Sequence, residues 1–263
     1  MNFTVASFKP GHSKLLAALA LCLTSLSMAA ESPQADQRVP VLVELFTSEG
    51  CSDCPPADAL LADLDAKQVV AGADAIVLSE HVTYWDRQGW RDPFSLEAMT
   101  QRQEEYVRRF GIDSAYTPQA VVDGTSQFVG SNGRAMVAAV SKAAAKPKLQ
   151  LEIVNARWDH GSVRFAVHGE KSKGAKLVVV LAANATHSEV ARGENAGRTL
   201  HHTAVVRVLK VFTGDAIDGR PLEVTAGPLA QANEASGPVR LVVFLADGGD
   251  GQVRGATQQV LSR

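Results

Sequence analysis

The chain has 263 residues, of which 46% are hydrophobic and 21% are charged, and its formal net charge at pH 7 is −2. This composition predicts a globular protein with a full-sized core and excludes a chain that is disordered throughout. The charge is nearly balanced and no basic stripe suited to phosphate backbones is present, so we expect no nucleic-acid partner.

The first 30 residues have the layout of a secretory signal peptide. Lys9 and Lys14 precede an apolar stretch, residues 15–26, which is well short of the ~20 residues that a transmembrane anchor needs. We therefore expect export to the periplasm or the medium, cleavage near Ala29 or Ala30, and no membrane contact afterwards. The mature chain of about 230 residues would carry 24 Lys and Arg against 28 Asp and Glu, a net charge of about −4.

The mature chain would hold two cysteines, Cys51 and Cys54, in the string TSEGCSDCPPAD. The run Val41 to Phe46 before them is apolar and rich in β-branched residues, which predicts a strand buried on both faces, and ADALLADL after them has helical spacing. The CxxC therefore lies where a strand leads into a helix. There the free N–H groups and the positive helix end stabilise an anion, so a thiol pKa of ~8.5 can fall to roughly 3.5–7.5.

This spacing suits thiol–disulfide exchange, because a cysteine one helical turn further on can attack a mixed disulfide formed by the first. We assign Cys51, nearer to the exposed loop, as the nucleophile and Cys54 as the resolving residue. A bond between them is allowed in an oxidising compartment, whether it is redox-active or only structural. Asp53 and Glu49 bring negative charge close to Cys51, which predicts a less stable thiolate and a potential on the reducing side of exported oxidases.

Further elements alternate strand and helix. Residues 75–82 form a second apolar run that predicts a buried strand, and the aromatic segment TYWDRQGWRDPF follows it. The next helix is predicted to open with Asp92 as N-cap and Pro93 at its first position, and to stop at Gly111.

The remaining sequence divides into a hairpin, a helix and a β-rich half. Asp123-Gly124 between two short apolar runs is a strong hairpin signal, and an alanine-rich helix follows it. From Leu149 the apolar period changes to two, and Gly, Asn and Asp turns separate the runs. We predict an α/β domain at residues 36–146 and an all-β, antiparallel, sandwich-like domain at residues 148–263.

A CxxC between a buried strand and a helix, followed by Thr117-Pro118, a hairpin and a final helix, resembles the thioredoxin fold. The resemblance implies that Pro118 follows a cis peptide bond and lies against the CxxC. It also implies that the backbone at Thr117 pairs with an extended substrate peptide by β-strand addition. More narrowly, the strings VELFTSEGCSDCPPAD, HVTYWDRQGWRDPF, YTPQAVVDG and GENAGRTLHH are similar to those of an exported bacterial thioredoxin-like family catalogued as a domain of unknown function.

The resemblance gives Glu44, the acid inside the first buried strand, the role of a buried proton acceptor beneath the resolving cysteine. Glu44 stands one residue further upstream of the first cysteine than the thioredoxin acid, so the sequence leaves open on which face of the strand its side chain lies. The alternative is a carboxylate that is turned to solvent or paired with Lys or Arg. A buried carboxylate would have a raised pKa that suits proton transfer.

Other candidate residues have competing interpretations. Trp85 and Trp90, with Tyr84 and Phe94, either line a substrate groove beside Cys51 or form a packed cluster. His81 could join the cysteines as a copper or zinc ligand, although a packed histidine at a strand end is commoner.

The string GENAGRTLHH suggests no chemistry, and we interpret it as a hydrogen-bonded corner. No nucleotide-binding loop or hydrolase elbow is present, and we expect no cofactor and no resident metal.

The sequence thus predicts an exported thiol–disulfide oxidoreductase. Cys51 and Cys54 carry the exchange, Glu44 relays a proton, and Thr117, Pro118, Trp85 and Trp90 bind the substrate. Its partners would be protein or peptide thiols and disulfides, together with a redox partner that restores the dithiol. The alternatives are a binding module with a structural Cys51–Cys54 disulfide and, less favoured, a copper or zinc delivery protein.

Overall fold

The computed structural model describes residues 4, 6–7, 38–230 and 237–263, and the predicted signal peptide lies almost wholly outside these ranges. Residues 38 onward belong to one unit, Asp36–Arg263. Its helices are α1 (Pro55–Lys67), α2 (Glu97–Phe110) and α3 (Gly133–Ala144). Its strands are β1 (Val39–Thr47), β2 (Ala73–His81), β3 (Gln119–Val122), β4 (Ser126–Val129), β5 (Leu151–Asp159), β6 (Ser162–Gly169), β7 (Lys176–Glu189), β8 (Thr199–Thr213), β9 (Leu222–Thr225), β10 (Val239–Ala246) and β11 (Val253–Leu261). Short 3-10 helices are η1 (Gly214–Ile217) and η2 (Gly227–Ala230).

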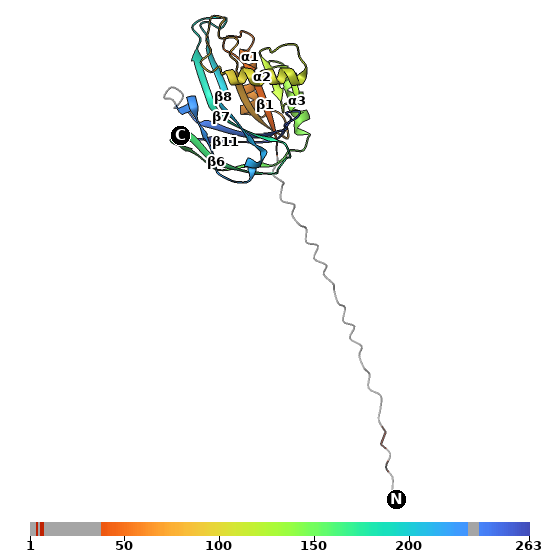
Figure 1. The fold of residues 1–263 in the computed structure, drawn as a ribbon. Helices are drawn as coiled ribbons and strands as arrows, with labels where there is room; N and C mark the ends of the chain where they lie inside the picture. Colours follow the sequence, from red (N-terminus) through yellow and green to blue (C-terminus); the bar gives the residue numbers. More distant parts are fainter. Residues whose placement is uncertain (1–3, 5, 8–37, 231–236) are drawn as a thin grey trace. The chain divides into compact units, whose positions relative to one another are not determined.

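The described residues form a mixed α/β structure around one large sheet (Figure 1). Its eight strands lie in the order β11-β10-β7-β8-β2-β1-β3-β4, and a second sheet has the order β5-β6-β9. None of the helices in the described part of the chain combines the length and the apolar character that crossing a membrane requires.

Strands β1 and β2 are parallel neighbours near the middle of the large sheet, with Val43 opposite Val77. Both are buried on both faces, as their nearly unbroken apolar runs predict. The two buried strands expected from the sequence are confirmed. Antiparallel β3 and β4 continue this side of the sheet, and the turn between them has Asp123 and Gly124 at φ 49° and 66°, which confirms the hairpin.

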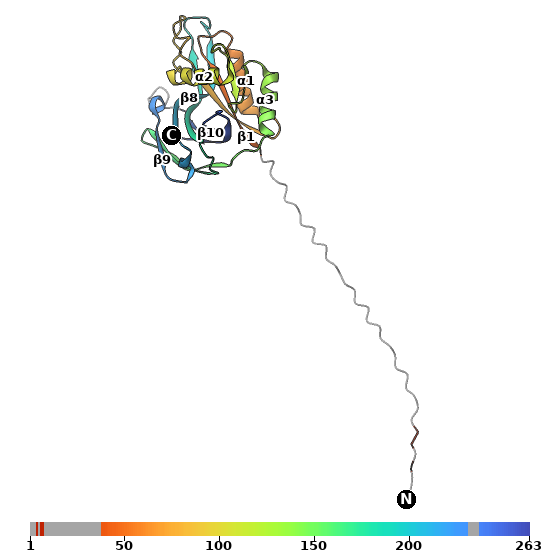
Figure 2. The same ribbon diagram turned by 45° about the vertical axis from the view of Figure 1, so that its right-hand side comes forward.

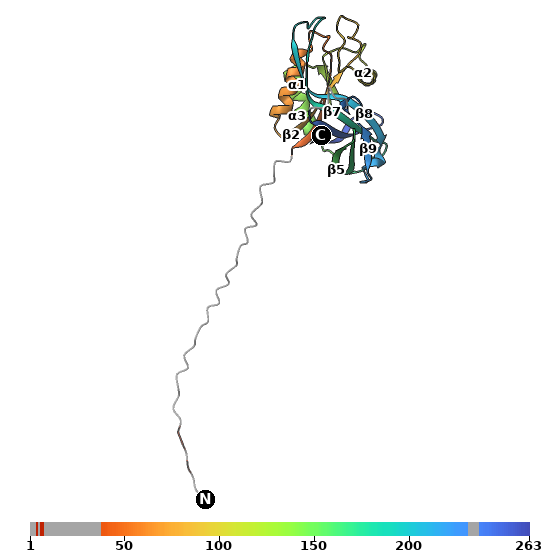
Figure 3. The ribbon, with the colours of Figure 1, turned by 90° about the vertical axis from the view of Figure 1, so that its left-hand side faces the viewer.

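The three helices cover opposite faces of this half of the sheet. α1 and α3 share a core cluster with Val43 and Leu45, whereas Met99 and Tyr106 of α2 pack in clusters with other side chains of β1 and β2. Figure 3 shows α1 and α3 on one side of the strands and α2 on the other. Because side chains alternate along a strand, adjacent residues of β1 face different helices.

The predicted start of the second helix is wrong. α2 begins at Glu97 after Leu96, not after Asp92, while its predicted stop at Gly111 is confirmed by a left-handed φ of 63°. The Asp92 carboxylate instead accepts hydrogen bonds from the backbone N–H groups of Phe94 and Glu49, and it lies within hydrogen-bond distance of His81 Nδ1. Hydrogen bonds with residues outside the helix therefore replace the capping role that the local sequence predicts for Asp92.

The C-terminal half is antiparallel within itself but joins the large sheet. β11, β10, β7 and β8 form consecutive antiparallel ladders, and β8 runs parallel to β2 where Ser79 pairs with Val205. In the view of Figure 2, β8 and β10 are labelled below α2. A core cluster joins their inner side chains to β6 and β9 of the smaller sheet. The apolar runs of period two after Leu149 form strands β5 to β10. This pattern did not predict β11, because Gly255 and paired glutamines interrupt its apolar period.

Buried charged groups link the two halves of the chain. Arg240 of β10 makes a bidentate ion pair with Asp65 of α1, at 2.6 and 2.8 Å. Lys148, at the predicted domain joint, contacts the Asp123 carboxylate at 2.5 Å and the Val253 carbonyl at 3.0 Å. The large sheet also continues across the boundary at residues 146–148, since β8 pairs with β2, and the division into two domains stays a prediction.

Candidate functional site

The cysteine pair lies at the junction of β1 and α1, where the sequence predicts it. Cys51 and Cys54 form a disulfide with their Cα atoms 5.4 Å apart. Cys54 occupies the N-cap position, and Pro55 and Pro56 begin the helix. Prolines lack an N–H group, but at the first helical positions that group has no partner within the helix. The disulfide therefore lies at the positive end of α1.

Cys51 is not exposed, contrary to the expectation from its position in the loop. Only 1% of Cys51 and none of Cys54 is accessible, although Ser52 and Asp53 between them are exposed. A distant segment contacts the backbone here, because the Asn195 Nδ2 atom donates to the Cys51 carbonyl at 2.9 Å. Sequence reasoning could not see this contact, because 144 residues separate the two positions.

The Thr117-Pro118 peptide bond is cis, as the thioredoxin resemblance implies. The Thr117 hydroxyl accepts a hydrogen bond from Trp85 Nε1 at 2.8 Å. A side chain added at Gly50, next to Cys51, would meet the Cβ atom of Trp85 at 3.1 Å. Trp85 therefore bridges the CxxC loop and Thr117.

The other predicted aromatic residues also anchor the site. Trp90 Nε1 donates to Glu49 Oε2 at 2.7 Å, and the Tyr84 hydroxyl donates to Gln103 at 3.1 Å. Phe94 is buried beside two histidine rings. The indole N–H groups of both predicted tryptophans are thus engaged within the protein, which fits the packed-cluster alternative as well as a groove.

The structure corrects the role of Glu44. Its carboxylate is fully buried on the α2 face of β1, where Arg102 donates to Oε1 at 2.6 Å and the Tyr106 hydroxyl donates to Oε2 at 2.5 Å. Glu80 lies beside the same guanidinium at 3.5 Å, and burial, followed by the charge of Glu44, raises the pKa of Glu80 well above its usual range. Because α1 covers the opposite face, Glu44 does not lie beneath Cys54. The alternative of a carboxylate paired with arginine is the one observed.

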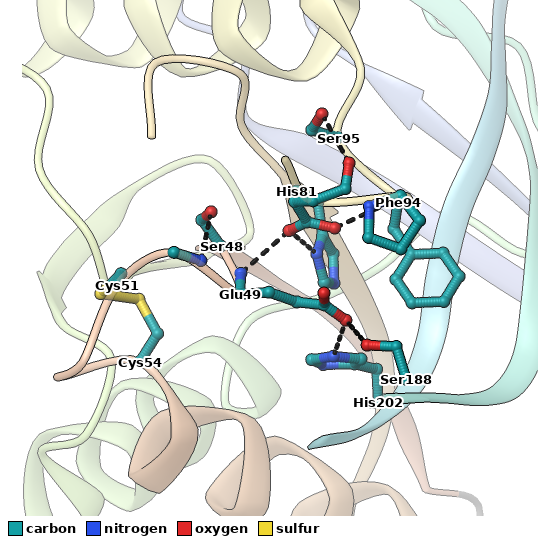
Figure 4. Close-up of polar contacts among 12 residues, drawn as sticks. Ser48, Glu49, Cys51, Cys54, His81, Phe94, Ser95, Ser188 and His202 are labelled. Atoms are coloured by element: carbon teal, nitrogen blue, oxygen red, sulfur yellow. Dashed lines mark hydrogen bonds and ion pairs between the residues drawn. A yellow bond between two sulfur atoms is a disulfide. The ribbon is translucent and has the colours of Figure 1, made fainter. Parts of the chain in front are cut away.

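A second buried carboxylate, Glu49, lies in the loop before the disulfide and was not singled out as a site residue. Its Oε1 atom contacts the hydroxyl of Ser188 and, at 3.2 Å, His202 Nε2. Trp90 Nε1 donates a hydrogen bond to the other carboxylate oxygen, Oε2. Figure 4 shows the Glu49 side chain extending away from the Cys51–Cys54 disulfide toward β7 and β8.

Asp58 is the buried acid in the first turn of α1. Its backbone N–H donates to the Cys54 carbonyl at 3.1 Å, so its side chain follows that of Cys54 by one helical turn. Oδ1 of Asp58 has no hydrogen-bond partner among the described residues, and Oδ2 lies 3.8 Å from His202 Nδ1. Burial raises the pKa of Asp58 from 3.8 to about 6, although the charge of His202 opposes the rise.

His81 and Asp92 form a second pair of a histidine and an acid, which lies next to His202. Its Nδ1 atom lies 2.7 Å from Asp92 Oδ2, which also accepts the backbone N–H of Glu49 at 2.9 Å. Burial alone would raise the pKa of Asp92, but the charge and hydrogen bond of His81, with backbone N–H donors, hold that pKa below its usual range. The imidazole rings of His81 and His202 meet edge to face at 4.7 Å.

These contacts bear on the metal alternative. Within the described ranges, no group of three or more His, Cys, Asp or Glu residues is arranged to hold a metal ion. His81 is fully buried, and its contacts are with Asp92, Phe94 and His202.

The residues that sequence reasoning missed are Glu49 as a buried anchor, Asp58, Asn195 and His202. Asp58 carried a detectable signal, since an acid at i+4 from Cys54 on a helix must share its face. The other contacts join segments that lie well over 100 residues apart.

Fold and site together define a mixed α/β protein with a buried CxxC disulfide at the start of a helix. Residues 42–246 match the family described as "Protein of unknown function (DUF1223)", and the chain belongs to this family. The expected membership of a family catalogued as a domain of unknown function is thus confirmed. No curated protein matches the chain.

A crystal structure of a protein from Agrobacterium tumefaciens is similar to this chain, with 24% sequence identity and a TM-score of 0.62. The match covers 86% of this chain and 96% of that one. At this level of identity the likeness shows a shared fold.

Proposed function

We propose that the protein is an exported thiol–disulfide oxidoreductase with a thioredoxin-like N-terminal half, acting in the periplasm or the medium on protein or peptide disulfides. The observation that carries the proposal is the Cys51–Cys54 disulfide at the N-terminal end of α1, directly after a buried strand. This position favours a thiolate on reduction. The order β1-α1-β2-α2-β3-β4-α3 and the cis bond before Pro118 further support the thioredoxin-like interpretation.

The exchange proceeds in two balanced steps. The Cys51 thiolate attacks one sulfur of a substrate disulfide and forms a mixed disulfide, and the other substrate sulfur leaves as a thiolate that takes a proton from solvent. Cys54 then loses its proton and attacks the Cys51 sulfur. The Cys51–Cys54 bond forms, the second substrate thiolate leaves, and the substrate has gained two electrons. An outside dithiol donor restores the reduced protein.

Asp58, rather than Glu44, accepts the proton of Cys54 in this scheme. It is buried, one turn after Cys54, and has a free carboxylate oxygen. A pKa of about 6 leaves it mostly ionised at neutral pH and close enough to the working pH for proton transfer. His202 beside Oδ2 stabilises the ionised form.

Substrate binding follows from the site around Pro118. The Thr117 backbone would pair with an extended peptide by β-strand addition, as the resemblance implies. Trp85, which bonds to the Thr117 hydroxyl and packs against Gly50, fixes the distance between this strand and the CxxC loop. Trp90 supports the CxxC loop indirectly, because its Nε1 atom donates to the Glu49 carboxylate.

Trapping of mixed disulfides tests the proposal. Cys54→Ala should accumulate disulfide adducts through Cys51 when the reduced protein meets a peptide that contains a disulfide, and mass spectrometry would locate the adduct. Cys51→Ala is the matched control and should accumulate far less. Equal, negligible trapping by both variants would contradict exchange.

The burial of Cys51 favours a second candidate, a binding module whose disulfide is purely structural. In that case the Cys51–Cys54 bond would fix the loop that Asn195 contacts. The double variant C51A/C54A would then lose stability, and the wild-type disulfide would resist reduction by dithiols without denaturant.

A further inference from the structure

The hairpin of β7 and β8 ends in a turn, residues 190–198, that we call the hairpin tip. The Val190 N–H donates to the Arg198 carbonyl at 2.9 Å and closes the tip. Gly193 has a φ of 80°, and a Cβ atom there would lie 3.1 Å from Trp90 Cβ. Glycine thus allows the tip to pack closely against the aromatic segment.

Asn195 attaches the tip to the CxxC loop. It is fully buried, and its Nδ2 atom donates to the carbonyls of Glu49 and Cys51, both at 2.9 Å. Its Oδ1 atom accepts from Arg198 at 2.9 Å. Both donors and the acceptor of this amide are therefore used, and two of the three bonds hold the backbone beside the nucleophile.

Glu194, the exposed neighbour of Asn195, accepts the backbone N–H of Ser52 at 3.1 Å. This N–H belongs to the residue after Cys51, at the junction whose donors would stabilise a Cys51 thiolate. A carboxylate bound there occupies the donor and adds negative charge close to the sulfur. Both effects disfavour the thiolate.

We propose that Asn195 and Glu194 are positioning residues that restrain Cys51. Asn195 holds the tip over the loop, and Glu194 occupies the Ser52 N–H until a substrate segment displaces it. The inference rests on the proposed exchange function and deepens it. An extended peptide suits this exchange of partners, because its backbone carbonyl can accept the N–H that Glu194 gives up. A small disulfide without such a carbonyl in register would react more slowly.

Alkylation of the reduced, otherwise intact protein tests the inference. The rate at Cys51 is measured with iodoacetamide from pH 5 to 9, and mass spectrometry separates modification of Cys51 from that of Cys54. Glu194→Gln keeps the side-chain size and removes the charge, so the rate profile should move to lower pH and the rate at pH 6 should rise at least threefold. Asn195→Ser frees the tip, so the limiting rate at high pH should rise at least tenfold.

Glu189→Gln is the matched control, because Glu189 belongs to the same hairpin but accepts from Thr199, away from the CxxC loop. Its rate should stay within twofold of wild type. Wild-type behaviour of both E194Q and N195S would overturn the inference and leave the exchange proposal standing. No alkylation of Cys51 in wild type or either variant without denaturant would overturn both. Because Glu194 is exposed, E194Q keeps the test valid if N195S does not fold.

Discussion

Glu44 and Glu49 are buried carboxylates of one short segment. They differ in the partners that their surroundings supply for the carboxylate charge. Glu44, on the α2 face, is matched by an arginine and a tyrosine hydroxyl. Glu49, in the loop before the disulfide, shares His202 with a second acid, Asp58, and both His202 Nδ1 and Asp58 Oδ1 lack hydrogen-bond partners among the described residues. In the first cluster Glu44 is fully paired, whereas both carboxylate oxygens of the neighbouring Glu80 lack hydrogen-bond partners among the described residues and burial raises its pKa. The second retains free proton-binding positions next to the cysteines.

The comparison teaches that burial alone does not identify a proton-transfer group. A buried acid held by a permanent cation has little tendency to exchange protons. A buried acid next to a histidine, with a pKa of about 6, can do so near neutral pH. The following predictions test the division between the Glu44 cluster and the Glu49–His202–Asp58 cluster.

The largest effect is expected in the Glu44 cluster. Arg102→Met would leave the Glu44 charge buried without its cation, and we expect a loss of about 3–5 kcal/mol in the free energy of unfolding. Urea denaturation measures it. Arg108→Met, on the exposed face of the same helix, should change stability by less than about 0.5 kcal/mol. A loss below about 1 kcal/mol for R102M would contradict the structural role.

Asp58 gives the next effect, and its sign is opposite to that of an ordinary ion pair. The folded state holds the Asp58 proton with a pKa of about 6 instead of 3.8, so this contribution to stability is complete below about pH 4 and is lost as the pH rises through 6. The loss corresponds to about 3 kcal/mol. Asp58→Asn should remove it when unfolding is measured from pH 4 to 7 with the disulfide intact.

Asp63→Asn, on the exposed face of α1 where Asp63 pairs with Lys67, is the control and should keep the wild-type slope. An unchanged pH dependence in D58N would show that Asp58 titrates normally.

The tryptophans give a smaller contrast. Trp90 donates to the charged Glu49 and Trp85 to the neutral Thr117 hydroxyl. Loss of a bond to a charged group costs about 1.5–3 kcal/mol, and loss of a neutral bond costs about 0.5–1.5 kcal/mol. Trp90→Phe should therefore destabilise the protein more than Trp85→Phe in parallel urea titrations. The reverse order would argue that Glu49 is not the principal anchor of the loop.

The smallest effect is expected for Glu44 on exchange itself. In single-turnover reduction of a fluorescent peptide disulfide at pH 7, Glu44→Gln should release product within about twofold of the wild-type rate. Asp58→Asn should slow release at least tenfold, since general-base groups contribute factors of about 100 or more. A slow E44Q beside a normal D58N would restore the role that the sequence assigned to Glu44.

The sequence predicted the local parts of this structure well. The buried strands, the Asp123-Gly124 hairpin, the stop at Gly111 and the cysteine pair at a strand-to-helix junction each depend on neighbouring residues. The start of α2 failed because Asp92 has partners from β2 and from the CxxC loop, which no local pattern contains.

At the candidate site, only the features that depend on neighbouring residues were predictable. Alternation along β1 sets Glu44 on a different face from Val43 and Leu45, but the sequence does not reveal which helix covers each face. The contacts of His202 and Asn195 with Glu49 depend on the β7–β8 hairpin reaching the CxxC loop, and more than 140 residues separate these partners. Long-range β pairing of this kind leaves no periodic signal.

The reduction potential of the Cys51–Cys54 couple tests the central claim most directly. Equilibration of the intact protein with glutathione or dithiothreitol buffers at pH 7 measures it. A working exchange couple predicts a value between about −120 and −270 mV, toward the more negative end because Glu194 and Asp53 add negative charge near Cys51. A value below about −300 mV would identify an inert structural bridge and contradict the account.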